Sequence, residues 1–420
     1  MKSQIFTGCI AAVLLSGCAH SAMPDASAET SVAPAPQPTT AVAQAPVAAP
    51  SQQMAIPADR NVLFWPQDVR AVAFRMMDQM PQVAQSRAID TGTSVLPLPD
   101  GEPLDLGDFE LDAFMQSQSS AGIVVVHDGE IVLERYGLGM TATDRWTSFS
   151  VAKSLTSTLV GAAIQDGHIE SLDDPVTRYI EDLQGSAYDD VSIRQLLTMS
   201  SGVRWNENYG DPNSDVAQFA NHQAEDGLDV TVSYMRNLPR ANEPGTNWRY
   251  STGETNLVGV LVSEAVGMPL ADYLSMKVWQ PFGMAYEASW LLGDTGHEIA
   301  GCCIQATTRD MARFGMFTLT DGMIDGDRIV PEGWFSEATD PAFQLSARGD
   351  GYGYQWWTHP GDTYAAQGIF GQGIFIDPSR DLVIATNANW PDATGNGGKG
   401  AERFAFYSAV QAAVDARMGD

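Results

Sequence analysis

The sequence predicts an α+β fold in which an antiparallel sheet is built from segments near both ends of the chain and flanked by helices. Two β-forming runs, 122–126 and 131–136, flank an Asp-Gly pair and indicate a hairpin. Two further runs, 373–376 and 382–385, are joined by a short turn. Because short connections favour antiparallel pairing, the stretch of about 150–300 is expected to be a mostly helical insertion.

Helices are expected before, inside and after these strands. Residues 66–80 place aliphatic and Met side chains at three-to-four spacing, and a final helix is predicted over about 402–416. Residues 150–165 carry one apolar stripe, with Gly167 where a C-cap glycine belongs. The folded domain is therefore expected over 58–420.

The N-terminus is typical of an exported bacterial protein. A charged start and a short apolar run predict a signal peptide over 1–17, too short for a membrane span. The residues Leu15-Ser16-Gly17-Cys18 resemble the bacterial lipobox, in which the cysteine becomes lipidated. An ordinary signal peptide that happens to contain Cys18 is the alternative.

The residues after Cys18 are consistent with a lipid anchor. Residues 18–57 are rich in Ala, Pro, Ser and Thr, so they are expected to form an extended, disordered tether. Ala19, rather than Asp, follows the cysteine and favours the outer membrane. The sequence thus predicts a lipoprotein of the bacterial envelope, anchored in the outer membrane and facing the periplasm.

Composition argues against several other classes of protein. The formal charge of −29 argues against a nucleic-acid partner, because phosphate backbones require clustered Lys and Arg. Six scattered histidines and the absence of a zinc-type motif predict neither a metal site nor a cofactor. The adjacent Cys302 and Cys303 are expected to be packing residues, since a bridge between neighbours strains their peptide bond.

The first candidate catalytic element is an S-x-x-K sequence formed by Ser150 and Lys153 at the start of an apolar helix. Residues three apart share one helix face, so the amine of Lys153 can reach the hydroxyl of Ser150. An apolar helix start can lower the pKa of a lysine enough to make it a base. The pattern also occurs by chance, as an ordinary serine and a snorkelling lysine, so the other motifs decide its meaning.

Two further elements complete the candidate site. Tyr250, in Tyr250-Ser251-Thr252, can move a proton between the nucleophile, Lys153 and a leaving group, although an isolated loop tyrosine is usually a packing residue. The glycine-rich run 365–373 lets a strand edge approach a substrate. A backbone N–H after Gly368 could then form an oxyanion hole with the N–H of Ser150.

These elements, in this order, resemble the penicillin-recognising serine hydrolases related to class C β-lactamases, and most closely the 6-aminohexanoate-dimer (nylon-oligomer) hydrolase branch. The resemblance covers about 110–415 and implies a fold of the β-lactamase and DD-peptidase type. It implies that Ser150 is acylated, that Lys153 and Tyr250 act as base and acid, and that the Ile369 N–H joins the oxyanion hole. The supporting stretches are 148–154, 195–203, 307–315 and 368–372.

The resemblance also implies a substrate pocket. The loop 205–212 is similar to one that lines the pocket of nylon-oligomer hydrolases, so Trp205 and Tyr209 are expected to contact the substrate. Gly368 and Gln372 are expected to belong to the same pocket.

Two departures from the family pattern bear on the substrate. Thr252 stands where β-lactamases carry Asn, and Gln367-Gly368 stands where they carry Thr-Gly after a lysine. Both changes remove groups that would hold the amide and carboxylate of a β-lactam. The sequence therefore favours a cofactor-independent esterase or amidase acting on a small ester or amide. A DD-peptidase or β-lactamase, and a catalytically idle envelope binding protein, are the alternatives.

Overall fold

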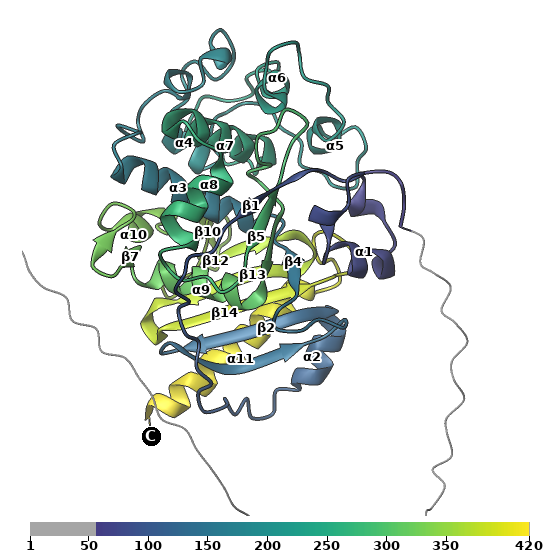
Figure 1. Cartoon of the computed structure of the whole chain (residues 1–420), viewed down its shortest axis with the longest axis vertical. Coiled ribbons are helices and arrows are strands. Elements are labelled where there is room, and N and C mark those ends of the chain that lie inside the picture. Colours follow the sequence, from purple (N-terminus) through teal and green to yellow (C-terminus); the bar gives the residue numbers. More distant parts are fainter. Residues whose placement is uncertain (1–55, 420) are drawn as a thin grey trace, which may run out of the picture. The chain divides into compact units, whose positions relative to one another are not determined.

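The computed structural model describes residues 56–419, and its largest element is an eight-stranded antiparallel sheet with the order β3-β2-β14-β13-β12-β11-β10-β9 (Figure 1). The predicted signal peptide, Cys18 and almost all of the tether predicted over 18–57 lie outside the described residues. The strands are β2 (Ser120–His127), β3 (Glu130–Tyr136), β9 (Phe343–Gln344), β10 (Gly351–Tyr352), β11 (Trp357–His359), β12 (Thr363–Gly368), β13 (Gln372–Asp377) and β14 (Leu382–Ala388).

The centre of this sheet joins the two ends of the folded domain. The β2–β3 hairpin turns at Asp128 and Gly129, whose φ angles of 52° and 78° suit the tight turn that an Asp-Gly pair favours. Strand β14 pairs with β2 in antiparallel register, with Leu382 opposite His127. The predicted α+β fold, with a sheet assembled from both ends of the chain, is confirmed.

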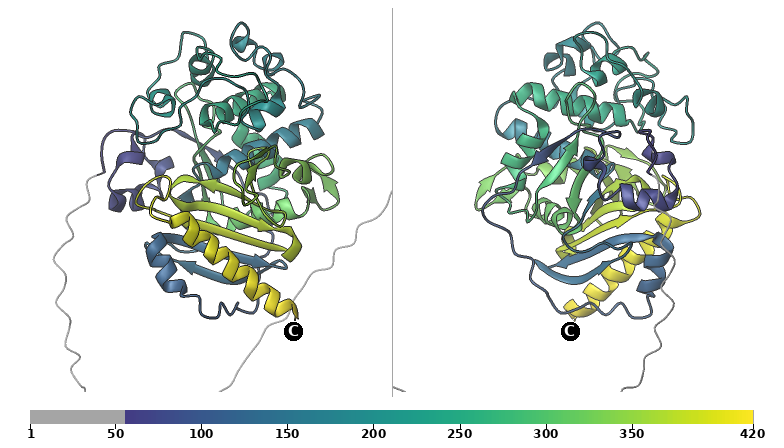
Figure 2. Two further views of the ribbon diagram at one scale, coloured as in Figure 1. Left: turned by 180° about the vertical axis from the view of Figure 1, so that it is seen from behind. Right: turned by 45° about the vertical axis from the view of Figure 1, so that its right-hand side comes forward.

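Successive residues of the central strands enter two different cores, as the period of a β-strand requires. Ile123 and Val125 face a cluster with Phe406 of the C-terminal helix, whereas Val124 and Val126 face the larger core on the opposite side. Figure 2 shows the long helix α11 (Lys399–Gly419) crossing one face of the sheet. Helix α2 (Leu111–Gln118) packs beside α11, and α9 (Thr308–Leu319) packs on β14 on the other face.

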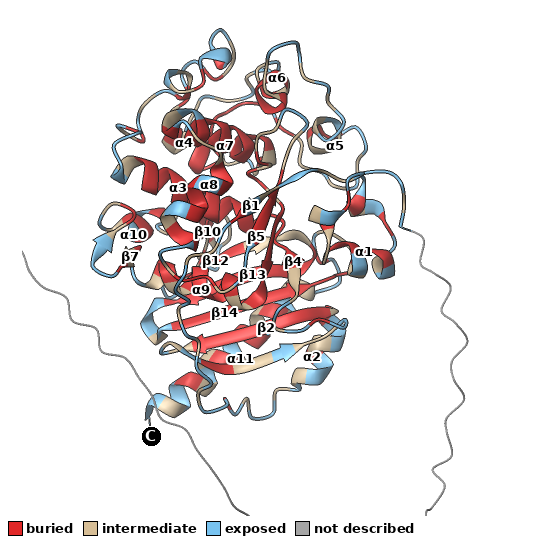
Figure 3. Ribbon diagram, viewed as in Figure 1, coloured by how far each residue is buried: buried red, intermediate tan, exposed pale blue. Residues whose placement is uncertain are grey.

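The predicted helical insertion is also present. Its buried centre is formed by α3 and α7, which pack against each other and appear almost entirely red in Figure 3. Helix α3 follows the predicted bounds closely, and Gly167 has a φ of 78° just beyond its end. The insertion contains α3 (Val151–Gln165), α4 (Ile193–Leu197), α5 (Asp215–Phe219), α6 (Val230–Met235), α7 (Thr252–Val266), α8 (Leu270–Leu274) and a π-helical turn (Ser275–Trp279).

A second, four-stranded antiparallel sheet was not predicted. Its order is β1-β5-β6-β4, and its strands are only three or four residues long. The two other strands, β7 and β8, form a small hairpin, and α10 is a short helix that follows it. The bounds of these elements are β1 (Ser86–Ile89), β4 (Arg145–Thr147), β5 (Ala288–Leu291), β6 (Ile304–Thr307), β7 (Met323–Ile324), β8 (Asp327–Arg328) and α10 (Trp334–Ala338).

The helix predicted over 66–80 is broken into α1 (Gln67–Ala73) and a 3-10 turn (Met77–Gln79). The carbonyl of Phe74 accepts a hydrogen bond from the N–H of Thr147, at 2.8 Å, and so pairs with the end of β4. A tertiary contact therefore ends a helix that the sequence pattern would continue. Among residues 56–419, no single helix is long and apolar enough to span a membrane, although the bent pair α7 and 270–279 has the required composition.

Candidate active site

Ser150 and Lys153 lie where β4 turns into α3. Phe149, just before the serine, has a φ of 42°, an unfavourable value for a bulky residue. Its ring is held by Phe74 and Phe370, with centroids 4.9 and 5.5 Å away. Packing thus fixes a sharp turn, and Nζ of Lys153 lies 3.3 Å from Oγ of Ser150.

The amine of Lys153 is only 1% exposed and is surrounded by oxygen acceptors. It donates to the carbonyl of Gly301 at 2.7 Å and to Oγ1 of Thr252 at 3.0 Å, in addition to Ser150. Burial lowers the pKa of Lys153 to about 8, although the carboxylate of Glu207 acts in the opposite direction. A useful fraction of this amine is therefore unprotonated near neutral pH.

The phenol of Tyr250 meets the same pair from another element. Tyr250 precedes α7, its phenol interacts with the side chain of Ser150, and Nζ of Lys153 lies 5.2 Å from its ring centroid. The ring stacks on Trp357 with a centroid distance of 5.8 Å. Burial, together with Glu207, raises the pKa of Tyr250, whereas the interaction with Ser150 opposes this change. The phenol is therefore held in its protonated form.

The end of β12 approaches the N–H of Ser150 closely. A Cβ atom added at Gly368 would lie 2.6 Å from the carbonyl oxygen of Ser148 and 3.1 Å from the nitrogen of Ser150. Only glycine fits such a gap without displacing backbone. Within residues 56–419, neither the N–H of Ser150 nor that of Ile369 donates to another protein group. Both are available to a substrate oxygen.

Glu207 is the main site residue that sequence reasoning did not identify. Its carboxylate accepts hydrogen bonds from the indole of Trp205, the hydroxyl of Tyr209 at 2.7 Å, and both the N–H and the hydroxyl of Thr252. Thr252 thereby bridges Glu207 and Lys153. The only available signal was its position inside the loop 205–212, because the partnership with Thr252 is purely tertiary.

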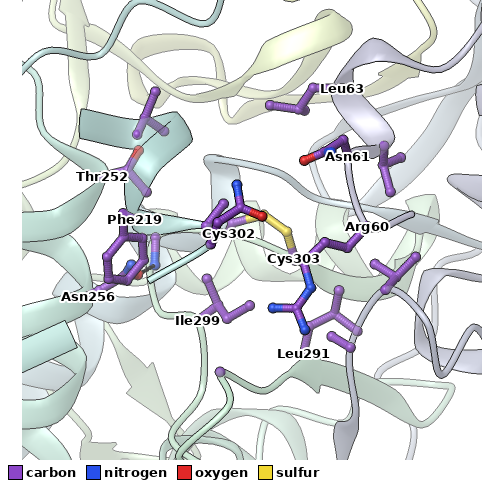
Figure 4. Close-up of a pocket in the computed structure, with 18 of the residues that line it drawn as sticks. Arg60, Asn61, Leu63, Phe219, Thr252, Asn256, Leu291, Ile299, Cys302 and Cys303 are labelled. Atoms are coloured by element: carbon purple, nitrogen blue, oxygen red, sulfur yellow. Dashed lines mark hydrogen bonds between the residues drawn. A yellow bond between two sulfur atoms is a disulfide. The ribbon is translucent and has the colours of Figure 1, made fainter. Parts of the chain in front are cut away.

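A cavity of about 740 Å³ opens beside Ser150. Figure 4 shows Thr252, Asn256 and Phe219 on one side and Asn61 and Leu63 on the other. The volume is in the range of small-molecule sites.

Of the predicted pocket residues, Tyr209 lines this cavity, as does Ile369 of the predicted oxyanion hole, whereas Gly368 does not line it. Contrary to expectation, Trp205 and Gln372 do not line it. Trp205 is 2% exposed and its indole is directed at Glu207. Gln372 is 1% exposed and is fully hydrogen-bonded, donating to the carbonyls of Ile369 and Ala388, so its role in the structure is to support the Ile369 turn.

The expectation for the adjacent cysteines is also corrected. Cys302 and Cys303 form a vicinal disulfide in the wall of the cavity, directly after Gly301 (Figure 4). Cys303 has a φ of 79°, a backbone conformation that is uncommon for residues other than glycine. Among residues 56–419, no group of three or more His, Cys, Asp or Glu side chains is placed to hold a metal ion.

Comparison with known proteins finds sequence similarity over most of the chain. A family model described as Beta-lactamase matches residues 110–405. The chain is 29% identical over 335 residues to the 6-aminohexanoate-dimer hydrolase of Paenarthrobacter ureafaciens, covering 76% of this chain and 84% of that protein. It is 26% identical over 234 residues to a β-lactamase of Pseudomonas fluorescens, covering 52% of this chain and 62% of that protein.

Among solved structures, the fold is similar to that of a Bacillus anthracis protein provisionally named as a 6-aminohexanoate-dimer hydrolase. The TM-score is 0.75 at 20% identity, covering 87% of this chain and 98% of the other. At this identity the similarity establishes the fold alone.

Proposed function

We propose, from the premise that this chain belongs to the β-lactamase family and is a serine hydrolase, that it cleaves small esters or amides through a covalent acyl-Ser150 intermediate. The observation that carries this proposal is the contact between Ser150 and a buried Lys153 whose pKa is lowered to about 8. A buried amine of this kind can act as a base at neutral pH.

The geometry supports a specific sequence of proton transfers. Oγ of Ser150 attacks the substrate carbonyl carbon while its proton passes to neutral Lys153. The N–H groups of Ser150 and Ile369 stabilise the oxyanion. Tyr250 then donates its proton to the leaving oxygen or nitrogen as that bond breaks, and the proton on Lys153 restores the phenol. Water attacks the acyl ester by the same route and releases the acid.

The surroundings of Gly368 favour this activity over action on β-lactams or cell-wall peptides. At the position where β-lactamases carry a polar residue before the glycine, Gln367 accepts a hydrogen bond from Arg403 and contacts His359 at 3.2 Å. The nearby guanidinium is thus already engaged, and it does not replace the missing lysine as a carboxylate-binding group. Nitrocefin hydrolysis or stable labelling by a fluorescent penicillin would support the β-lactamase or DD-peptidase alternative.

The proposal is tested by replacing the nucleophile and one matched serine. Ser150→Ala should abolish hydrolysis of p-nitrophenyl butyrate and labelling by a fluorophosphonate probe. Ser157→Ala is the control, because Ser157 lies on the same helix and its hydroxyl has no hydrogen-bond partner in the described structure. Full activity in Ser150→Ala would defeat the proposed mechanism, and a wild-type protein inert to both reagents would favour the idle binding protein.

We also propose that the protein is exported and lipidated at Cys18, and that it faces the periplasm from the outer membrane. The lipobox-like residues 15–18 and the Ala19 that follows support this localisation. Cys18→Ala should lose incorporation of labelled palmitate in a Gram-negative host and should leave the membrane fraction. Cys9→Ala, inside the signal peptide, is the control. Unchanged labelling of Cys18→Ala would refute lipidation at this site.

A further inference from the structure

The cavity beside Ser150 is completed by a segment outside the family domain. The matched region begins at residue 110, yet Leu63, Val83 and Ala84 line the cavity. The segment 60–84 is held against the loop before the disulfide, because Arg60 forms an ion pair with Asp294 at 3.2 Å. The wall opposite α5 is thus supplied by this N-terminal segment, which lies outside the range matched by the family model.

Packed apolar side chains connect the region of the nucleophile to this segment. Phe149, next to Ser150, and Ile369 belong to the same hydrophobic cluster as Leu63, Val83 and Ala84. Leu291 and Ile299 join the cluster from below, as Figure 4 shows. A surface of such side chains binds hydrocarbon and offers little to a polar group.

The carboxylates and the arginine that line the cavity are already partnered. Asp59, at the rim, accepts hydrogen bonds from the indole of Trp65 at 3.0 Å and the N–H of Asn61 at 2.8 Å. The others form ion pairs, which are Arg60 with Asp294, Asp229 with His297 and Glu298 with Arg87. An anionic group in this cavity would lose its hydration without gaining a free cation, which is costly, and among the described lining residues an ammonium group would find only Asp59, at the rim, without a cationic partner.

The position of the proton donor indicates which half of the substrate occupies the cavity. In the mechanism above, the leaving group must lie within reach of the hydroxyl of Tyr250. Ser150 and Ile369 line the cavity, whereas Tyr250 and its neighbour Trp357 do not. The cavity therefore extends from the carbonyl on the acyl side.

From these observations, and resting on the proposed function, we propose that the cavity binds a neutral, apolar acyl chain of medium length. Substrates would be esters or amides whose acyl group carries no charge at its far end. This class differs from the charged oligomer in the name of the relative from P. ureafaciens, because an ammonium or carboxylate would meet an apolar wall.

The first test is a series of p-nitrophenyl esters from acetate to decanoate. We expect kcat/KM to rise about fourfold for each added methylene until the chain reaches the end of the cavity. A matched series of acetate esters with longer alcohols should show no such rise. If Ser150-dependent hydrolysis is present but kcat/KM is flat in the acyl series, or rises only with the alcohol, this inference fails while the proposed function stands. If no ester or amide is hydrolysed, the proposed function itself fails.

The second test places a charge at the chain end without changing its length. p-Nitrophenyl 6-aminohexanoate is nearly isosteric with p-nitrophenyl heptanoate, but it ends in an ammonium group. We expect kcat/KM to be at least about tenfold lower for the ammonium ester, since the carboxylates of Asp229, Asp294 and Glu298 are already paired with cationic side chains. Equal or faster hydrolysis of the ammonium ester would overturn the assignment of a neutral chain.

A variant pair locates the effect in the N-terminal segment. Ala84→Phe fills the cavity, and it should reduce the ratio of kcat/KM for octanoate to that for acetate by at least about tenfold. Ala88→Phe is the control, because Ala88 is exposed on β1 and does not line the cavity. An unchanged ratio in Ala84→Phe, with the fold intact by circular dichroism, would show that the acyl chain binds elsewhere.

Discussion

The buried amine of Lys153 determines how activity should depend on pH. Burial lowers its pKa to about 8, against the opposing effect of Glu207. Because only the unprotonated amine can accept the proton of Ser150, kcat/KM should increase as pH rises through about 8 and then level off. The measurement is the pH profile for p-nitrophenyl butyrate. A profile with no inflection between about pH 6 and about pH 9.5 would contradict the role of Lys153 as the base.

Glu207 acts on the reaction through Lys153, so its replacement should move that profile. Glu207→Gln removes the negative charge that raises the pKa of Lys153, and the midpoint should therefore shift to lower pH. The amide also accepts fewer of the hydrogen bonds made to the carboxylate, so the free energy of unfolding should fall by about 1–3 kcal/mol for each buried donor left unpaired.

Glu181→Gln is the control for this variant, because Glu181 is exposed and does not line the cavity. A purely structural role for Glu207 predicts lower stability with an unchanged midpoint, and that result would contradict its electrostatic effect on Lys153. Urea unfolding and pH profiles of both variants separate the two roles.

At the scale of one strand, the close approach of β12 to Ser150 leads to a third prediction. Gly368 has a φ of −122°, so its backbone suits any residue, but an added methyl group would press on Ser148 and cover the N–H of Ser150. Gly368→Ala should therefore lower kcat by about a hundredfold or more, as expected when an oxyanion donor is lost. Gly400→Ala, where nothing lies within 4 Å of the added atom, is the control. Comparable kcat in the two variants would contradict the oxyanion site.

Elements with a local signal were predictable, and those created by tertiary contacts were not. The Asp128-Gly129 hairpin and the apolar helix after Ser150 follow from turn chemistry and periodicity. The four-stranded sheet could not be predicted, because its strands have three or four residues and come from distant segments. The break after Ala73 depends on a bond from Thr147, which no local pattern contains.

The candidate site shows the same division. Ser150, Lys153 and Tyr250 were recognisable from motifs in which the chemistry lies in the residue types and their order. The burial of Trp205 and Gln372 was not, since a motif does not reveal which side of the chain faces a cavity. The contribution of the segment 60–84 to the cavity wall was not predicted either, because its residues carry no catalytic motif and contact the site only through tertiary packing.

In the whole molecule, the proposed nucleophile lies where the large sheet, the helical insertion and the N-terminal segment meet. Ser150 follows β4, Tyr250 precedes α7, and Gly368 ends β12. The same apolar cluster that holds Phe149 in its turn contains the buried side chains of α1 and the 3-10 turn after it. The catalytic geometry and the N-terminal segment therefore share one piece of core, and neither is expected to be maintained without the other.

This shared core predicts that the region matched by the family model is not a sufficient folding unit. A protein spanning 58–420 keeps every described element, whereas one spanning 110–405 lacks α1, β1 and most of α11. The shorter form also lacks six large buried side chains of the apolar cluster, which are Val62, Trp65, Val69, Phe74, Met77 and Met80. At about 1.5–3 kcal/mol for each buried side chain, their loss is comparable to the total stability of a typical domain, about 5–15 kcal/mol. We expect 58–420 to unfold cooperatively on heating and to react with a fluorophosphonate probe, and 110–405 to show neither property. Cooperative unfolding of 110–405 with normal labelling would show that the N-terminal segment is an independent addition and not part of the core that positions Ser150.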